Sequence, residues 1–373
     1  MSRKLRSLSG LVVLGVALCT LFWNLPINSL YSTPSSGISV NHDILEQPGL
    51  GPSLIAIPAA SDEEETSAAP EQDKKALLDV LDRARENVTV AIVTTILAPS
   101  STFSMWLDYH LRIVDLVIIF ADDPNRKHQF ERFIRGKPVV VFDGSTTAND
   151  MSAESRIIMR QTDNINAAIE YGLQHNITWL LHIDIDEIFY ENGNHTWSTW
   201  QDVGSVIFTN HESVPLAHSV TNSFVECTIF KMNSGGLPFM AYSNGKSAVR
   251  LTPGVESNGP HMFKGYEPDQ WREITVPMIL HYSTPSYENW VKKYLHYGNF
   301  SNYWYDHPDY PIGLPFMLQS RDLVQQGSAT GNWQRAKEFF MRQIPDKEAI
   351  QTLLEQGSLG RIMPLQAGTS KNN

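Results

Sequence analysis

The sequence predicts an α/β protein whose mostly parallel sheet forms a domain behind a single N-terminal membrane-spanning helix. Apolar, β-branched runs alternate with helix-period segments in the middle of the chain, which is the pattern of a parallel sheet covered by helices. An uncharged run of about 20 residues follows a short basic N-terminus and is long enough to span a hydrocarbon core. The 373 residues allow one large domain or two small ones, plus appendages.

The composition excludes several classes of protein. The formal net charge is -11, from 29 Lys+Arg and 40 Asp+Glu, and 42% of the residues are hydrophobic. Such an acidic chain lacks the dense basic face that a sequence-independent nucleic-acid binder needs, and it is too hydrophobic for a wholly disordered protein. The two cysteines, Cys19 and Cys227, exclude a disulfide framework and a Cys-rich metal site. Cys227 is expected to be a buried apolar residue.

The N-terminus predicts a membrane anchor. Residues 1–7 carry three basic residues and no acid, and residues 8–27 carry no charge. This order predicts a cytosolic tail at 1–7, a signal-anchor helix at 8–27 and a lumenal remainder. The alternative is a cleaved signal peptide with its apolar core at Leu11–Leu21. The anchor is favoured because no small-x-small cleavage site follows, Thr20–Trp23 being bulky.

A flexible stem is predicted over residues 28–80. This stretch is rich in Ser, Pro, Ala and Gly, contains the acidic run Asp62–Glu65, and has few large apolar residues with which to form a core. Tail, anchor and stem are the layout of a type II membrane protein, with a folded domain expected at 81–345 and a C-terminal tail at 346–373. Four Asn-x-Ser/Thr sequons are compatible with a lumenal domain: Asn87, Asn176, Asn194 and Asn299.

The first predicted elements are a strand, a helix and a strand. Val88–Ile96 is apolar and β-branched throughout, as in a strand covered on both faces, and the Ser- and Pro-containing stretch Ala98–Ser101 ends it. Met105–Val114 follows with helical spacing of its apolar residues. Leu116–Phe120 is a second buried strand, which two aspartates and a proline follow at 122–124.

The alternation continues to a fourth strand. A polar helix over Arg126–Arg135 leads to a third strand at Pro138–Phe142, and the long amphipathic helix Ala153–His175 precedes the strand Thr178–Ile185. Strands that alternate with helices imply a largely parallel sheet. Ligands bind to such sheets beyond the carboxyl ends of the strands.

That rule selects two acidic places. Asp122 and Asp123 follow the second strand, and Asp184, Asp186 and Glu187 end the fourth. In an extended segment Asp184 and Asp186 point to the same face, where two carboxylates can hold a hard divalent cation and leave positions open for phosphate oxygens. The apolar residues on both sides of this motif argue against a merely solvated acidic turn.

The same residues resemble a known family. TWLLHIDIDEIFY, residues 178–190, is similar to the Trp-hydrophobic-Asp-x-Asp-Glu strand of GT-A glycosyltransferases, particularly glycosyltransferase family 92, the former DUF23 group. The resemblance extends over about 88–310. Four further stretches resemble the plant KOBITO glycosyltransferase-like proteins: residues 210–213, 242–250, 258–261 and 279–282.

The resemblance implies a GT-A fold, Rossmann-like and mostly parallel, and a metal site. Asp184 and Asp186 would hold Mn²⁺, or Mg²⁺, against the donor diphosphate, with Asp186 the stronger candidate for direct contact. Glu187 would either brace the turn or act on the metal through water. GT-A folds usually add a C-terminal histidine, for which His261 is the first candidate and His281 the second.

The resemblance also suggests donor-binding residues. Asp122 or Asp123 would contact the nucleoside, unless they cap the helix that follows Pro124. Arg156 and Arg160, one helical turn apart, could reach the diphosphate or lie on a solvated face. The predicted donor-binding set is Thr94, Asp122, Asp123, Arg156, Arg160, Asp184, Lys246 and Arg250, the last two expected on one face of a strand at Lys246–Leu251.

Catalytic and acceptor residues are chosen by position. Glu212, after a predicted strand at Ser205–Thr209, is the first candidate for the base, and Glu226 the second. Aromatic residues make up ten of the thirty residues at 281–310. Trp290 and Tyr294 share a helical face there and would either stack on an acceptor sugar or dock the helix onto the core.

The leading hypothesis is a Golgi or ER type II membrane enzyme. It would be a metal-dependent glycosyltransferase that moves a sugar from a nucleotide-sugar, most simply a UDP-sugar, to a glycan or glycoconjugate acceptor, with inversion as the resemblance implies. The alternative is a non-catalytic glycosyltransferase-like protein that binds a glycan or a protein partner. No nucleic acid is expected as a partner.

Overall fold

The computed structural model describes residues 88–146, 153–191, 197–200, 202–215, 219–302 and 315–365. The expected tail, anchor and stem lie outside these residues, as do the sequons at Asn87 and Asn194. Within the described part of the chain, no helix combines the length and the apolar character that crossing a membrane requires.

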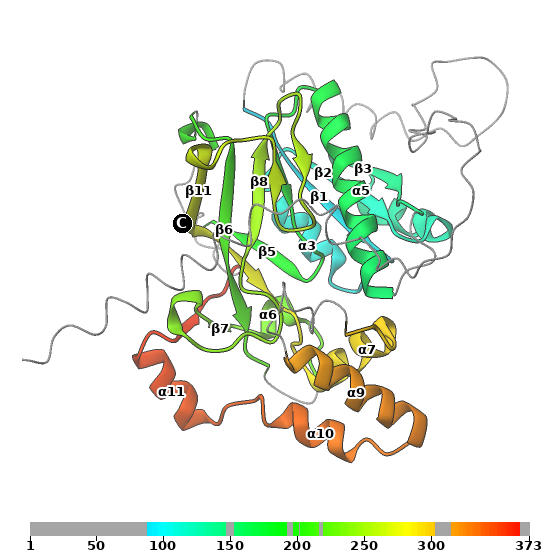
Figure 1. Ribbon diagram of the computed structural model, residues 1–373, viewed down its shortest axis with the longest axis vertical. Coiled ribbons are helices and arrows are strands. Elements are labelled where there is room, and N and C mark those ends of the chain that lie inside the picture. The colour runs from blue at the N-terminus through cyan, green and yellow to red at the C-terminus, as the bar shows by residue number, and fades with distance from the viewer. Residues whose placement is uncertain are drawn as a thin grey trace, which may run out of the picture.

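One half of the sheet is parallel, as predicted (Figure 1). Strand β1 (Val90–Ile96) lies between β2 (Leu116–Ala121) and β4 (Trp179–His182), and β3 (Val139–Asp143) lies outside β2. The apolar residues of β1 and β2 are almost completely buried, which explains why these strands contain no polar alternation.

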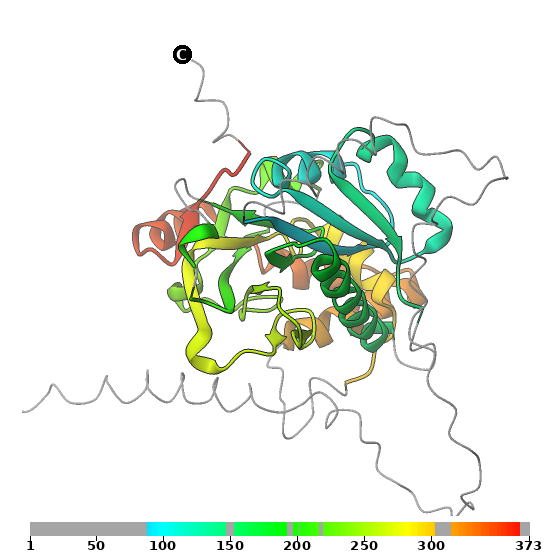
Figure 2. The same cartoon turned by 90° about the horizontal axis from the view of Figure 1, so that it is seen from above.

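Helices cover both faces of this half (Figure 2). Helix α3 (Phe103–His110) packs on one face, and α5 (Ala153–Gln174) packs on the other. The link from β2 to β3 is a 3₁₀ helix, η3 (Pro124–Phe130), followed by the short α4 (Glu131–Ile134). Buried Cys227 belongs to the same core as α3.

The other half of the sheet departs from the parallel prediction. Strand β8 (Lys246–Arg250) lies antiparallel between β4 and β6 (Ser205–Ser213). The long β11 (Trp271–His281) runs parallel to β6, and β5 (Glu187–Tyr190) pairs antiparallel with β11. The architecture is therefore a mixed α/β, Rossmann-like sheet that is parallel from β3 to β4 and contains both antiparallel and parallel pairs beyond β4.

Helix α3 fixes the start of β5. The indole Nε1 of Trp106 donates to the carbonyl oxygen of Glu187 at 2.7 Å. The His110 ring lies with Nδ1 at 2.9 Å from the Trp106 carbonyl oxygen, and its Nε2 accepts from the Phe189 amide at 3.2 Å. These buried contacts hold the segment that follows β4 against the core.

The C-terminal part adds helices at the lower end of the molecule in Figure 1. Helix α7 (Tyr287–Tyr297), α9 (Pro315–Thr330) and α10 (Gln334–Met341) form a helical layer with its own aromatic core. Helix α11 (Lys347–Glu355) and strand β12 (Leu359–Arg361) follow, and β12 pairs with β7 (Ile229–Lys231). The expected C-terminal tail at 346–373 is therefore structured over most of its first half, where it completes one edge of the sheet.

The remaining described elements are short: η4 (Trp197–Thr199), α6 (Ser223–Glu226), η5 (Asn233–Gly235), β9 (Glu256–Ser257), β10 (Phe263–Lys264) and η6 (Pro268–Gln270).

Candidate active site

The two aspartates of the motif lie in a turn rather than on a strand. Strand β4 ends at His182 and β5 begins at Glu187, so Asp184 and Asp186 lie between them, in a segment that we call the Asp-x-Asp turn. The Glu187 amide donates to the Asp184 carbonyl oxygen at 3.1 Å. The premise of an extended segment with both carboxylates on one face is wrong, and each aspartate has its own cation.

Asp184 is held by residues from two other elements. Lys246 Nζ, from the first residue of β8, lies 2.7 Å from Asp184 Oδ2, and Gln161 Nε2 of α5 donates to Oδ1 at 2.7 Å. Lys246 is completely buried, whereas the Asp184 side chain is 25% exposed. Because β8 runs antiparallel to β4, its first residue lies where β4 ends. Although burial disfavours its ionised form, Lys246 and His182 hold the pKa of Asp184 below its ordinary value.

The Glu187 side chain stabilises this turn through a hydrogen bond to its backbone. Its Oε2 accepts the Asp184 amide at 2.7 Å and lies 3.7 Å from Lys246 Nζ. The side chain is completely buried, and its Oε1 has no hydrogen-bond partner among the described residues. Burial, which outweighs the attraction of Lys246, raises the pKa of Glu187. Of the two roles expected for Glu187, the structure shows the brace.

Asp186 faces the helical layer. Lys293 Nζ of α7 donates to Asp186 Oδ2 at 3.2 Å and to the Ser283 carbonyl oxygen at 3.0 Å. His281 Nε2, from the last residue of β11, lies 3.6 Å from the same carboxylate oxygen. Burial opposes ionisation of Asp186, but Lys293 and His281 hold its pKa well below the ordinary value.

His281, the second candidate, is the histidine beside Asp186. The first candidate, His261, places Nδ1 2.8 Å from the Gly245 carbonyl oxygen, and its ring packs edge-on against Tyr242. The Tyr242 ring also stacks on His281, with the centroids 4.8 Å apart. Both histidines therefore contact the same tyrosine ring. Of these two histidines, only His281 is described within ion-pair distance of the Asp186 carboxylate.

Two side chains of the site, Asp186 and His281, are of the chemical types that bind a divalent cation. Within the described ranges, no three His, Cys, Asp or Glu side chains converge into a preformed metal site. Asp184 accepts hydrogen bonds at both of its oxygens. Asp186 and His281 nevertheless supply a carboxylate oxygen and an imidazole nitrogen, which suit Mn²⁺. Mg²⁺-like ions are usually held by one or two carboxylates together with substrate phosphates, so a pair of protein ligands is enough.

The predicted donor-binding residues near the ends of β1 and β2 have different surroundings in the structure. Arg160 binds Asp122 with two hydrogen bonds, at 2.6 and 2.9 Å. Asp123 caps η3, since its Oδ1 accepts the Asn125 amide at 3.1 Å, which favours the capping interpretation of this residue. Thr94 is buried on β1, and its hydroxyl has no partner among the described residues. Arg156 lies in α5, but its side chain is outside the described part.

Both candidate bases have structural partners. Glu212 lies within β6 and is completely buried; its carboxylate accepts the Met240 and Ala241 amides and pairs with Lys231 at 3.0 Å. The strand continues to Ser213, beyond the predicted end, which takes Glu212 into the sheet. Glu226 accepts the amides of Thr221 and Asn222, at the start of α6. Burial and these contacts deny Glu212 the exposed position that a base requires. Glu226 is exposed, and its Oε1 is engaged by the two backbone amides.

Three more predicted residues are structural. Arg250, at the far end of β8 from Lys246, donates to the Val203 and Trp200 carbonyl oxygens and lies over the Trp179 ring. Trp290 and Tyr294 are buried in the core of the helical layer, and Trp290 Nε1 donates to Ser320 Oγ at 2.9 Å. The burial of both rings favours the docking interpretation of this aromatic face, with the rings packed in the core of the helical layer. Lys246 and Arg250 lie at opposite ends of β8.

Sequence reasoning missed Lys293 and Gln161. Lys293 meets a partner 107 positions away, and nothing in its own segment, which is dominated by aromatic residues, indicates that contact. Gln161 follows Arg160 on the helix before the motif, which was the one available signal that this helix faces the site.

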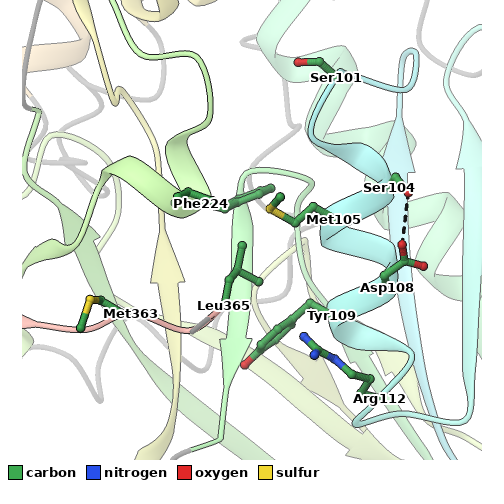
Figure 3. A pocket seen from close by; sticks show the side chains of 10 residues that line it. Ser101, Ser104, Met105, Asp108, Tyr109, Arg112, Phe224, Met363 and Leu365 are labelled. Carbon is green, nitrogen blue, oxygen red and sulfur yellow. Dashed lines mark hydrogen bonds between the residues drawn. The ribbon is translucent and has the colours of Figure 1, made fainter. Parts of the chain in front are cut away.

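A cavity of about 620 Å³ lies apart from these residues (Figure 3). It opens between α3, α6 and residues 363–365, and none of the predicted site residues lines it. Arg112 lies over the Tyr109 ring on one side, and Met105, Phe224 and Leu365 form an apolar side. The motif is therefore placed outside this cavity.

The fold and this turn define a mixed α/β protein with an acidic motif at the carboxyl end of a central strand, and the comparisons agree with a glycosyltransferase-like class. No family model matches the chain. Two Arabidopsis thaliana proteins, both named glycosyltransferase-like, are similar to it. One is 26% identical over 240 residues, 52% of this chain and 53% of that protein. The other is 27% identical over 160 residues, 36% of this chain and 31% of that protein. The chain thus spans about half the length of one relative and less than a third of the other.

Proposed function

We propose that the chain is a glycosyltransferase that uses a nucleotide-sugar donor, with UDP as the nucleotide. The observation that carries the proposal is the Asp-x-Asp turn itself: two ionised carboxylates at the carboxyl end of β4, backed by two ammonium groups and one histidine. The similarity to two glycosyltransferase-like proteins supports it independently of that geometry. The acceptor would be a glycan or glycoconjugate, and inversion rests on the resemblance to family 92.

The two aspartates of the turn would have different roles. Asp186 and His281 would hold Mn²⁺, which when bound supplies positive charge to a departing diphosphate. The hydrogen bonds from Lys246 and Gln161 fix the Asp184 carboxylate, so Asp184 would hold the turn in one conformation when the donor binds. For Asp186 to take the ion, Lys293 must leave its carboxylate, and the 24% exposure of the Lys293 side chain leaves it room to do so.

The nucleoside would bind at the carboxyl ends of β1 and β2. Thr94 lies near the carboxyl end of β1, the strand next to β4. Asp122 follows the last residue of β2 and pairs with Arg160 of α5. The Thr94 hydroxyl has no hydrogen-bond partner in the described part of the chain, which supports this placement, because a buried hydroxyl without a hydrogen bond costs free energy that a ligand can recover.

We also propose a type II arrangement in the Golgi or ER membrane, with this domain in the lumen. The support is the sequence of the first 80 residues and the exposure of the two described sequons, Asn176 and Asn299. A fall in apparent mass after enzymatic removal of N-linked glycans is the expected result. A chain that carries no such glycan in a secretory host would contradict the lumenal placement.

Asp186→Asn tests the proposed activity. We expect the variant to lose at least about 100-fold in metal-dependent UDP-sugar hydrolysis, since a metal ligand is replaced by an uncharged amide. Asp269→Asn, an exposed carboxylate in η6, is the matched control and should behave like the wild type. Circular dichroism would confirm that both variants fold.

The outcomes separate enzyme from binding protein. Unchanged hydrolysis in Asp186→Asn would refute the role of this turn. Saturable UDP binding by the wild type without hydrolysis of any UDP-sugar would instead favour the non-catalytic alternative.

A further inference from the structure

Few of the described cations near the Asp-x-Asp turn can meet an anionic ligand. Lys246 is completely buried between Asp184 and Glu187. Arg160 already makes a two-point contact with Asp122. Lys293 is different, because its side chain is 24% exposed and its carboxylate partner, Asp186, is 35% exposed.

The contacts of Lys293 suit a movable ammonium. Its Nζ donates to Asp186 Oδ2 at 3.2 Å and to the Ser283 carbonyl oxygen at 3.0 Å, which uses two of its three N–H groups. The ammonium also lies 6.0 Å from the centre of the Tyr297 ring. The Asp186 distance is longer than the 2.7 Å that joins Lys246 to Asp184, so this pair is the looser of the two.

The helical layer positions the Lys293 side chain beside the Asp-x-Asp turn. Helix α7 is capped by Ser286, whose Oγ accepts the Asn289 amide, and it is anchored by the buried Trp290 and Tyr294. Lys293 comes one position before Tyr294, on the flank of the helix that faces Asp186. The aromatic core that sequence reasoning considered as an acceptor platform therefore positions a cation at the site.

We propose that Lys293 is a binding residue for the diphosphate of the donor, and that its ammonium moves from Asp186 to the phosphate oxygens when the donor binds. The proposal rests on the proposed function, since it needs a nucleoside diphosphate at the Asp-x-Asp turn. It assigns to one ammonium two successive partners: a carboxylate in the free protein and a phosphate in the complex. The same movement frees Asp186 for the divalent cation.

The test compares UDP with uridine, which lacks the phosphates. Isothermal titration calorimetry would measure both ligands, with Mn²⁺ present, on the detergent-solubilised full chain and on Lys293→Met. We expect Lys293→Met to weaken UDP binding by roughly 10- to 100-fold, the effect of one charge-assisted hydrogen bond, and to leave uridine binding unchanged. Lys292→Met is the matched control, because Lys292 is the exposed neighbour on α7 and its loss changes the net charge equally.

Each result is decisive. A wild-type chain that does not bind UDP refutes the proposed function. Normal UDP binding by Lys293→Met, with the wild type binding UDP, overturns the role of Lys293 alone. Parallel loss of UDP and uridine binding shows a merely structural role and also overturns it. Where Lys293→Met fails to fold, Lys293→Gln takes its place, since its amide can still donate to Ser283.

Discussion

At the scale of single residues, two lysines neutralise the carboxylates of the Asp-x-Asp turn: Lys246, which is completely buried, and Lys293, which is partly exposed. Burying a carboxylate next to an ammonium is only stabilising when geometry and additional hydrogen bonds compensate for lost hydration. Asp184 meets that condition through Lys246 and Gln161. Glu187 meets it incompletely, because one of its oxygens has no described partner. The turn is therefore held together at the cost of one poorly compensated buried carboxyl group.

Glu187 predicts a specific dependence of stability on pH. Burial raises its pKa from 4.5 to about 7, so the folded chain binds a proton there at a pH where the unfolded chain does not. Lowering the pH from about 8 to about 5 must therefore add stability through this group. In urea denaturation, we expect this gain to be about 1–3 kcal/mol larger for the wild type than for Glu187→Gln, which does not titrate.

The control for this measurement is Glu273→Gln, an exposed position on β11. Its pH profile should match that of the wild type. If Glu187→Gln and the wild type have parallel profiles, Glu187 does not titrate in this range and the brace is ionised throughout.

The sequence predicted individual residues of the site but not the contacts between them. Asp184 and Asp186 follow a buried strand, Lys246 begins a strand of clear alternation, and His281 ends one, so all four are visible in their own segments. These residues come together through the pairing of distant strands, and the sequence of one segment does not show which strand it pairs with. Glu212 was misjudged because the hydrophobic pattern does not show that β6 continues for four more residues.

At the scale of elements, the antiparallel β8 matters most. It replaces a parallel neighbour of β4 and so takes its first residue, rather than its last, to the ligand-binding edge. The helix–strand alternation before residue 185 predicted the parallel half correctly, because each crossover helix carries its own periodicity. Beyond that point the strands are linked by irregular segments, so sequence alone indicated the strands but not their directions.

The backbone turn just before β8 leaves no room for a side chain at Gly245, so we predict that alanine there is destabilising. Gly245 has a φ of 73°, and a Cβ there would lie 2.0 Å from the Phe208 carbonyl oxygen. Gly245→Ala must shift the backbone just before Lys246. We expect a loss of at least about 2 kcal/mol in the free energy of unfolding, beyond the roughly 1 kcal/mol cost of alanine at positive φ, together with weaker UDP binding.

Gly236→Ala is the matched control for this prediction. Gly236 has a φ of 72°, and a Cβ added there would have no neighbouring atom within 4 Å, so this position has the conformational cost without the clash. Equal destabilisation by the two substitutions would show that the close approach of Gly245 to β6 is not a constraint.

At the scale of the whole molecule, the C-terminal segment belongs to the fold. β12 pairs with β7, and Leu359 packs with Val214 and Ile229 under α11. The sequence suggested a tail because Ser, Gly, Lys and Asn are frequent there, but three residues are enough for an edge strand when another strand supplies the partners.

Two truncations test this closure of the sheet. A chain that ends at Asp346 loses α11 and β12, exposes the edge of β7, and should lose roughly 3–5 kcal/mol of stability and aggregate on heating. A chain that ends at Leu365 keeps both elements and should unfold like the full chain. Thermal denaturation of the two proteins makes the comparison, and equal midpoints would mean that β12 adds nothing to the sheet.

The ion pair of Lys293 and Asp186 also joins the helical layer to the sheet, whose hydrophobic cores are distinct among the described residues. Cooperative unfolding depends on such links, because regions that share few contacts open independently. If donor binding transfers the ammonium from the turn to the phosphate, the ligand itself becomes the link between the layers. The donor would then decide whether the helical layer unfolds together with the sheet or before it.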